Sequence, residues 1–249
     1  MHSLTRYFVA CTFFCSFLLS SLCHAETWKI ITLDWPPYTN EKDAELGAAS
    51  KALKEALHSV GINVEFVFMP WSRGIYEVKK ADYVGIFPVW NGGAHKEGKL
   101  SPILFSSPIG FVYNKDEIHH WTKLEDFKGL NIGIVQSYEY PDEILDLGKK
   151  GVYHLQSVTS DEQNLHKVAY KRIDLTIVDL VNARYLTEVR HPELKPLLTF
   201  DPKIYQKADL FISLKNDKHF EERFKKLKEA FKKVKTQKIV DQYVLKILK

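Results

Sequence analysis

The sequence is nearly free of cysteine, and it lacks the short motifs of several large enzyme classes. Its three cysteines, Cys11, Cys15 and Cys23, all lie in the N-terminal stretch, so the chain from Glu26 onward contains none. This absence excludes disulfides, a thiolate nucleophile and cysteine–zinc sites from that part of the chain. No HExxH, GxSxG, GxGxxG or P-loop motif is present. We therefore expect no enzyme of these classes.

A strong excess of one charge is also missing. The chain has 35 Lys and Arg against 31 Asp and Glu, and without Arg6 the basic residues number 34. An excess of this size, spread along the chain, does not favour a nucleic-acid partner. His119 and His120 are adjacent and point in different directions on most backbones, which disfavours a metal site. We expect no metal and no cofactor.

The first 25 residues have the pattern of a signal peptide. A short polar start and Arg6 precede an apolar run from Tyr7 to Leu22, and small residues stand at Cys23 and Ala25. The pattern predicts cleavage after Ala25 and a periplasmic location. The alternative is a membrane anchor, but the apolar run is shorter than the ~20 residues that a span prefers.

The chain after the signal peptide alternates between strand and helix patterns. Pro36 and Pro37 end the first strand and present Trp35 and Tyr38 on a loop, and Gly61 is a natural stop for the first helix. The predicted strands are at 28–33, 64–68 and 82–87, and the predicted helices at 46–60 and 71–80. This order is typical of parallel βαβ units.

The stretch from Val84 to Tyr113 organises the rest of the chain. We predict a buried strand that breaks at Pro88, then a polar loop, then an extended run through Phe105 and Pro108. The loop contains Trp90, Asn91, Gly92 and Gly93. The residues from Gly110 onward are interpreted as a bridge into a second lobe. A bridge beside a polar loop predicts a cleft between two lobes.

The second lobe repeats the strand and helix alternation. Capping boxes are predicted at Thr122–Glu125 and Ser160–Gln163, and Pro141 is placed to start a helix. Asp179 stands at the end of an apolar strand. The predicted extended segments are 131–136, 174–178 and 208–214, and the predicted helices begin near 141, 161, 181, 220 and 239. The lysines opposite the apolar stripe of the helix from Phe220 are interpreted as a solvated face rather than a membrane or partner patch.

These motifs, in this order, resemble the family 3 extracellular solute-binding proteins, the periplasmic receptors of polar amino-acid ABC importers. The resemblance rests on Trp-Pro-Pro-Tyr at 35–38, Pro-Trp-Ser-Arg at 70–73, Phe-Ser-Ser-Pro at 105–108, Ile-Gly-Ile-Val at 132–135, Tyr-Glu-Tyr at 138–140 and the Asp residues at 174 and 179. It implies a bilobal α/β periplasmic-binding-protein fold of type II, with two lobes joined by two crossing strands and a ligand cleft between them. The implied lobe 1 is 26–112 with 204–249, and lobe 2 is 113–203.

The resemblance also implies roles for individual residues. Tyr38 would stack on the ligand's side chain, and Asp179 would take an α-ammonium group. The family's arginine for the α-carboxylate is missing from the segment at 94–99, where Lys99 falls nearest by spacing. A lysine is a point charge without the planar fork that binds a carboxylate through two hydrogen bonds. The identity of the ligand is therefore left open.

Each candidate site residue has a structural alternative. Arg73 either supplies an anion site at a helix start or forms a surface ion pair. Asp179 binds the ligand, caps the helix that follows it, or does both. Trp71 and Trp90 wall the cleft or pack in the core, and Trp90 with Asn91 belongs to the polar loop. Glu139 is an exposed turn carboxylate by default. Asp179 and Glu139 are one example of two carboxylates across a cleft, as acid–base chemistry uses, but nothing in the sequence singles out a proton-transfer pair.

We therefore predict a monomeric periplasmic protein that captures a small polar solute and delivers it to an inner-membrane ABC permease. Two alternatives remain. One is a sensing protein that docks on a membrane signalling receptor, and the other is a small-molecule lyase of the same fold. The ligand-binding candidates are Tyr38, Trp71, Arg73, Trp90, Asn91, Lys99, Glu139 and Asp179.

Overall fold

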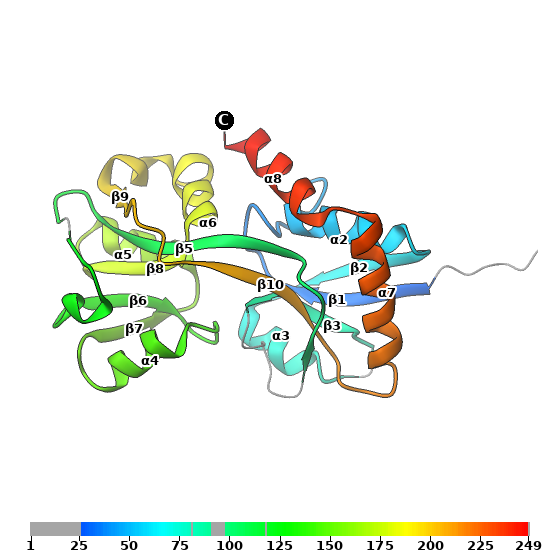
Figure 1. Ribbon diagram of the computed structural model, residues 1–249. Helices are drawn as coiled ribbons and strands as arrows, with labels where there is room; N and C mark the ends of the chain where they lie inside the picture. Colours follow the sequence, from blue (N-terminus) through cyan, green and yellow to red (C-terminus); the bar gives the residue numbers. More distant parts are fainter. Residues whose placement is uncertain (1–25, 81, 91–97, 118, 249) are drawn as a thin grey trace, which may run out of the picture.

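The computed structural model describes residues 26–80, 82–90, 98–117 and 119–248. Two α/β lobes lie side by side, and one ten-stranded sheet runs through both of them (Figure 1). The strand order is β2-β1-β3-β10-β5-β8-β6-β7, with β4 (Lys99–Leu100) on β10 and β9 (Leu198–Phe200) on β5. This arrangement confirms the predicted bilobal α/β fold. The lobe boundaries given above remain a prediction.

Lobe 1 is built on the parallel strands β1 (Glu26–Thr32), β2 (Ile62–Phe68) and β3 (Gly85–Trp90). The helix α2 (Ala48–His58) buries its alanine and leucine face on this sheet. The other helices of the lobe are α3 (Trp71–Glu77), α7 (Phe220–Lys233) and α8 (Thr236–Ile247), and α8 lies beside α2 (Figure 1). The βαβ pattern at the start of the chain is thus confirmed.

The predicted strand break at Pro88 is wrong. The strand β3 continues through Pro88 to Trp90 and pairs with β10 (Gln206–Leu214). The register of this pair shifts between Phe211 and Ser213, which face Val89 and Ile86. Pro88 therefore lies opposite an irregularity in the ladder, where a strand tolerates the missing backbone N–H. As a result Trp90 belongs to a strand rather than to a loop.

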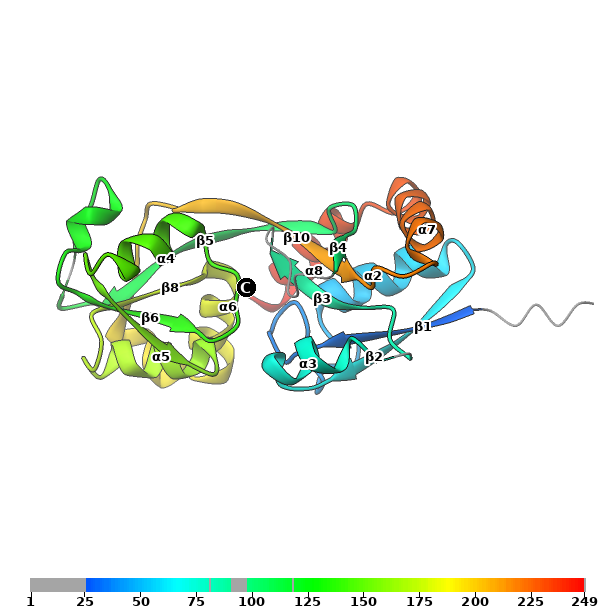
Figure 2. The same cartoon turned by 90° about the horizontal axis from the view of Figure 1, so that it is seen from below.

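The two lobes are joined by β5 (Phe105–Asn114) and β10. The first half of β5 pairs with β10, and from Ile109 onward β5 pairs with β8 (Leu175–Asp179). Both connecting strands cross from one lobe to the other without interruption (Figure 2). The predicted bridge at 110–113 is confirmed, and it is part of one long strand.

Lobe 2 is built on β6 (Asn131–Val135), which runs parallel to both β8 and β7 (His154–Val158). Its helices are α4 (Asp142–Lys149), α5 (Asp161–Ala169) and α6 (Leu180–Tyr185), with a π-helical turn at Leu186–Arg190 and 3₁₀ turns at Leu124–Phe127 and Pro192–Leu197. The sequence pattern did not reveal β7, because the segment HLQSV has no clear alternation.

Neither predicted capping box forms in full: the box at Ser160 has only its hydroxyl half, because Gln163 reaches the N–H of Thr159 rather than that of Ser160, and the other is wrong. The hydroxyl of Ser160 accepts the backbone N–H of Gln163 at 3.3 Å, and the Gln163 side chain accepts the N–H of Thr159 at 3.2 Å. At the 3₁₀ turn, however, Asp126 rather than Glu125 accepts the N–H of Thr122, at 2.7 Å. A 3₁₀ turn is tighter than an α-helix. A different side chain therefore reaches back to the N–H of Thr122.

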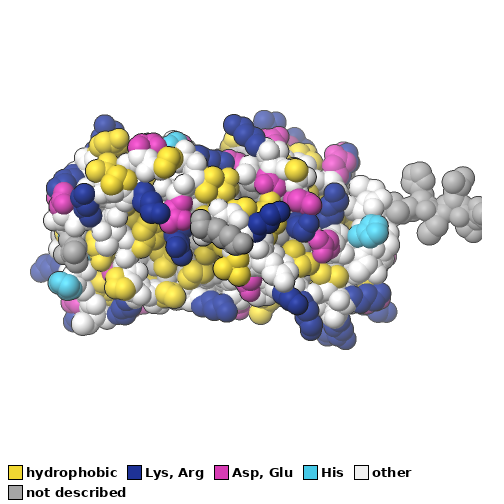
Figure 3. Space-filling model, turned by 90° about the horizontal axis from the view of Figure 1, so that it is seen from above, with side chains coloured by type: hydrophobic (Ala, Val, Ile, Leu, Met, Phe, Trp, Pro, Cys, Tyr) yellow, Lys and Arg dark blue, Asp and Glu magenta, His cyan; other side chains and the backbone are white. Residues whose placement is uncertain are grey.

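Charge on the face of the molecule drawn in Figure 3 is mixed rather than segregated. On the face in Figure 3, Lys and Arg side chains are interspersed with Asp and Glu, and hydrophobic side chains show between them. Among the described residues, no helix is both long enough and apolar enough to cross a membrane. The predicted signal peptide and Asn91 lie outside the described residues.

Candidate functional site

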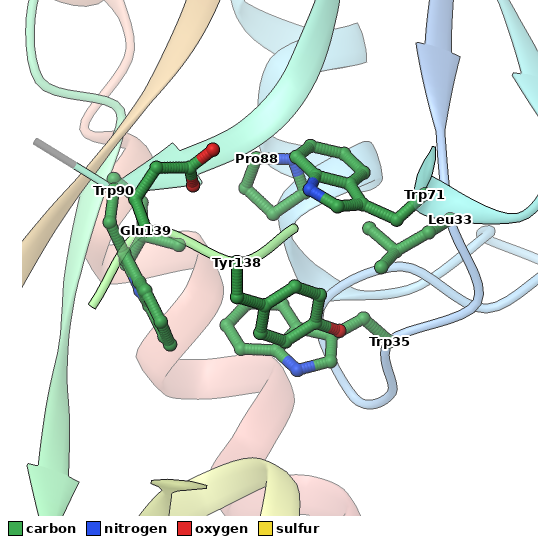
Figure 4. Close-up of a pocket in the computed structure, with 8 residues that line it drawn as sticks. Leu33, Trp35, Trp71, Pro88, Trp90, Tyr138 and Glu139 are labelled. Atoms are coloured by element: carbon green, nitrogen blue, oxygen red, sulfur yellow. The ribbon is translucent and has the colours of Figure 1, made fainter. Parts of the chain in front are cut away.

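The candidate site is a small cavity between the two lobes, with about 20 Å³ of space for the centre of a water-sized sphere. Lobe 1 supplies most of its lining and lobe 2 supplies the turn after β6 (Figure 4). The lining residues are Leu33, Trp35, Trp71, Pro88, Trp90, Tyr138, Glu139 and Leu210. That space holds about one water molecule and is far smaller than the ~300 Å³ at which ligand pockets usually begin. In this closed arrangement the lining side chains therefore fill most of the site.

The loop that carries Trp35 and Tyr38 is held by the start of α2. The first backbone N–H groups of that helix, from Ala48 and Ala49, donate to the carbonyls of Pro37 and Tyr38 at 2.8 Å. Gly47 precedes them with φ 93°, and a Cβ on Gly47 would lie 2.6 Å from the carbonyl oxygen of Tyr38. Only glycine adopts this conformation readily and permits this approach. The helix start and the glycine together fix the loop at the cleft.

Tyr38 contacts Asp179 across the cleft. The Tyr38 hydroxyl donates to the Asp179 carboxylate, with distances of 3.1 Å to Oδ1 and 3.4 Å to Oδ2. Oδ1 also accepts the backbone N–H groups of Val181 and Asn182, so Asp179 is the N-cap of α6. Both side chains are buried, at 2% and 1% exposure. The helix-cap interpretation of Asp179 is confirmed, and the same carboxylate faces the other lobe.

A second carboxylate of lobe 2 forms an equivalent contact. The Nε1 of Trp35 donates to Oδ2 of Asp161 at 3.0 Å, and Asp161 is 5% exposed in the first turn of α5. The rings of Trp35 and Tyr38 lie 4.8 Å apart. These two neighbouring lobe 1 side chains therefore donate to two buried carboxylates of lobe 2.

Four further polar contacts join the lobes around this centre. Nε1 of Trp71 donates to the carbonyl of Ser137 at 3.0 Å, and Arg190 forms an ion pair with Asp34 at 3.0 Å. The amide of Asn182 donates to the carbonyl of Pro36, and the amide of Asn40 lies 3.5 Å from the hydroxyl of Tyr185. Taken together, the contacts describe a closed arrangement of the two lobes.

Aromatic rings form most of the cavity wall. The Tyr138 ring meets the rings of Trp71 and Trp90 edge-on, with centroids 6.4 Å and 5.8 Å apart, and Tyr140 lies 5.9 Å from Trp90 (Figure 4). Trp90 is buried, and its Nε1 has no hydrogen-bond partner among the described residues. Tilted and edge-on rings of this kind leave faces and edges free for a ligand.

The acidic side chains of the site are partly desolvated by burial. Burial raises the pKa of Asp161 to about 7 and that of Asp179 to about 6. Burial also raises the pKa of Glu139, on the cavity rim, to about 7. No described Lys or Arg lines the cavity, while Lys207 lies with Glu139 and Asp209 in an adjoining hollow. Among the described residues, the site therefore has acceptors without a balancing cation.

The structure brings some of the predicted candidates together and places others elsewhere. Tyr38, Trp71, Trp90, Glu139 and Asp179 all lie at the cleft. Two cationic candidates do not line the cavity. Arg73 is exposed and pairs with Glu77 at 3.9 Å, as its surface alternative predicts, and the Nζ of Lys99 lies over the ring of Phe220, 4.5 Å from its centre.

Sequence reasoning missed Asp161, Tyr138 and Ser137 and gave Trp35 less weight than Tyr38. Asp161 stands within a capping box, a local motif that already explains an acidic residue there. The loop position predicted for Trp35 does not reveal that its N–H crosses to the other lobe. The double aromatic Tyr-Glu-Tyr was the available signal for Tyr138.

A cluster on lobe 2 has the residue types of a metal site. One ligand atom each from Glu162, His166 and His191 lies within 4.8 Å of the others. His191, however, already contacts Glu162 at 3.0 Å and Glu193 at 3.2 Å through its two ring nitrogens. Only the contact with Glu193 is a hydrogen bond, because the Nε2 that faces Glu162 has no hydrogen-bond partner among the described residues. The cluster shares no residue with the lining of the aromatic cavity.

Similar structures share this fold. No family model and no curated protein matches the chain. A histidine kinase sensor domain with similarity to periplasmic binding proteins matches with a TM-score of 0.73 and 16% identity, over 88% of this chain and 97% of that one. An amino acid ABC transporter substrate-binding protein from Streptococcus pneumoniae, bound to L-arginine, matches with a TM-score of 0.70 and 13% identity, over 89% and 94%. An ancestral amino-acid-binding protein described as a precursor of cyclohexadienyl dehydratase matches with a TM-score of 0.67 and 16% identity, over 90% and 96%. The chain has the type II periplasmic-binding-protein fold.

Proposed function

We propose that this protein is a periplasmic solute-binding protein, exported by a cleaved signal peptide, that captures a small polar solute by closure of its two lobes. The observation that carries the proposal is the set of contacts across the cleft, above all Tyr38 with Asp179 and Trp35 with Asp161. A site divided between two lobes is complete only when the lobes meet. The cavity lies where the two halves join.

The two connecting strands give the lobes a hinge. Opening the cleft breaks the few polar contacts across it and leaves the ladder of β5 with β10 in place. A ligand that contacts both lobes then stabilises the closed state by its differential affinity for that state. A few charge-assisted hydrogen bonds and aromatic contacts supply an affinity near micromolar, about 8 kcal/mol.

We further propose that the liganded, monomeric protein delivers its solute to an inner-membrane ABC permease. The similar structure from Streptococcus pneumoniae supports this assignment, because it is an ABC transporter substrate-binding protein. The similar sensor domain favours a second candidate, docking on a membrane signalling receptor. Both candidates need the same closed, liganded form. A permease gene or a sensor kinase gene beside this one in the genome would separate them.

An enzymatic role has less support. Asp161 and Asp179 form hydrogen bonds with side chains of lobe 1, and in the described part of the chain neither forms an ion pair with a basic group that would accept or return a proton. A lyase remains testable, because a bound compound that is consumed can be seen by mass spectrometry. Recovery of the bound compound unchanged after prolonged incubation is the expected result.

A thermal-shift screen tests the proposed function. The purified protein is heated with amino acids, amines, organic acids and oligosaccharides. A ligand at a hundred times its dissociation constant adds about 2.7 kcal/mol of stability, which is readily measured. Small-angle scattering with and without that ligand then reports whether it changes the balance of open and closed forms. Failure of every class to shift the transition would overturn the proposal.

A further inference from the structure

The cleft has an unusual balance of charge. Asp161 and Asp179 are buried behind the aromatic wall, and Glu139 lies on the cavity rim. Their present partners across the cleft are neutral N–H and O–H groups of Trp35 and Tyr38. No described residue that lines the cavity is cationic. Buried carboxylates are stable as charges only when a cation or several hydrogen bonds balance them.

Three helix starts at the cleft do not offer a site for an anion. An anionic ligand group is commonly held by free backbone N–H groups at the start of a helix. Here the first N–H groups of α6 donate to Asp179, and Asp161 adds a negative charge to the first turn of α5. In lobe 1, the first N–H groups of α2 donate to the loop carbonyls at 37 and 38. At these three starts a ligand carboxylate would meet a carboxylate or occupied donors. The short helix α3, whose Trp71 lines the cavity, has no side-chain cap and is the exception.

The aromatic wall adds a preference of its own. The cavity is lined by three indoles and a phenol, from Trp35, Trp71, Trp90 and Tyr138. Indole faces attract ammonium and guanidinium groups more strongly than other side-chain rings do. The wall and the carboxylates thus favour the same sign of ligand charge, through two independent kinds of interaction.

We infer that the ligand of this cleft is a small organic amine, bound as a cation and carrying no carboxylate group. This inference rests on the proposed function. The protonated nitrogen donates to the lobe 2 carboxylates and lies against the indole faces of lobe 1. In this closed structure Trp35 and Tyr38 donate hydrogen bonds to the two carboxylates. The ligand nitrogen replaces these hydrogen bonds or adds to them. The unpartnered Nε1 of Trp90 is free to donate to a neutral oxygen, such as a hydroxyl, on the same ligand.

Matched ligand pairs test the inference directly. Agmatine is arginine without its carboxylate, and cadaverine is lysine without its carboxylate, so each pair differs in that group alone. Titration calorimetry of the purified protein at about pH 8, where the lobe 2 carboxylates are ionised, measures all four affinities. We expect at least one amine to bind with a dissociation constant at least tenfold lower than that of its amino acid.

Isosteric variants show whether the cleft carboxylates are responsible. Asp161→Asn and Asp179→Asn keep a hydrogen-bond acceptor for Trp35 and Tyr38 and remove the charge. Each is expected to weaken amine binding at least tenfold. The matched control is Asp201→Asn, because Asp201 is also buried and accepts the Nε1 of Trp121 at 2.7 Å, outside the cleft. That variant is expected to bind the amine as the parent protein does.

The possible outcomes distinguish a wrong ligand class from a wrong function. Tighter binding of arginine or lysine than of its amine would overturn the inference and leave the proposed function standing. Binding of only a sugar or an organic acid in the wider screen would do the same. An amine that binds equally well to all three variants would place its site outside the cleft and overturn the inference. No binding by any compound would overturn both the inference and the proposed function.

Discussion

The two lobes contribute opposite chemistry to the same cleft. Lobe 1 brings aromatic donors on a loop and on the first turn of α3, and lobe 2 brings carboxylate and carbonyl acceptors at the starts of helices and in a turn. Within lobe 2, Asp161 and Asp179 are buried and form no ion pair with a residue that the structure describes. Within lobe 1, burial of Trp35 and Tyr38 is favourable because the rings are apolar. Burying the site residues therefore costs more free energy in lobe 2 than in lobe 1.

The largest effect is expected from displacing the loop of lobe 1. Gly47→Ala places a Cβ 2.6 Å from the backbone of Tyr38 at φ 93°, and we expect it to lower the free energy of unfolding by about 3 kcal/mol. Gly61→Ala is the control, because Gly61 has φ 78° with no atom within 4 Å of the added Cβ, and a loss of only about 1 kcal/mol is expected. Urea unfolding measures both. Equal losses would show that the approach to Tyr38 is unimportant.

The next effect concerns the acceptor half of the site. Asp179→Ala leaves the Tyr38 hydroxyl and two backbone N–H groups at the start of α6 without an acceptor, and a loss of about 2 kcal/mol is expected. Asp179→Asn retains a cap and is expected to cost under about 1 kcal/mol. Thermal unfolding of the two variants at about pH 7 checks the order. A more stable alanine variant would mean that relief of the buried charge outweighs the lost hydrogen bonds.

The pH dependence sharpens the contrast between the lobes. Because the pKa of Asp161 is about 7 in the folded protein and about 4 in an unfolded chain, the folded state holds the proton more tightly. Its contribution to stability is full below about pH 4 and is lost as the pH rises through about 7, and Asp179 acts in the same direction. At pH 8, Asp161→Asn is expected to raise the free energy of unfolding by about 2 kcal/mol, with little change at pH 4.

Asp201→Asn serves as the control for this pH series. Asp201 keeps the same indole and carboxylate pairing, but away from the cleft. Denaturant unfolding at several pH values compares the three proteins. A gain at pH 8 for Asp201→Asn as large as that for Asp161→Asn would show that the effect is not a property of the cleft.

The smallest effect is expected at the rim, where the lobes differ least in exposure. Arg190 and Asp34 form an ion pair across the cleft with side chains that are 28% and 45% exposed. A double-mutant cycle with Arg190→Ala and Asp34→Ala is expected to give a coupling energy below about 1 kcal/mol. The coupling should disappear at ~1 M salt, where the screening length is ~3 Å. A larger coupling that resists salt would make the rim a main determinant of closure.

Much of the fold could be predicted from local pattern. Alternating strand and helix signals, the double proline at Pro36 and Pro37, and the long extended run into Tyr113 each depend on neighbouring residues. Pro88 was misread because its tolerance depends on the pairing with β10, where Phe87 and Pro88 together lie opposite Ile212, more than a hundred residues later in the chain. No local rule contains that information.

The site was predictable only in part, for a similar reason. Tyr38 and Asp179 follow strands and could be recognised by position. Asp161 and Trp35 acquire their roles from each other, across a sequence separation of 126 residues. Lys99 was favoured by spacing, yet its side chain lies over the ring of Phe220. Spacing predicts which loop a residue occupies, whereas packing decides where its side chain points.

The position of β10 between β3 and β5 has a consequence for the order of folding. The three parallel strands of lobe 1 are made first, but the strand that joins their sheet to β5 follows the whole of lobe 2 in the chain. During synthesis, the sheet of lobe 1 therefore lacks β10 and has an unpaired edge at a stage when all strands of lobe 2 have been made. Such long-range pairing slows folding.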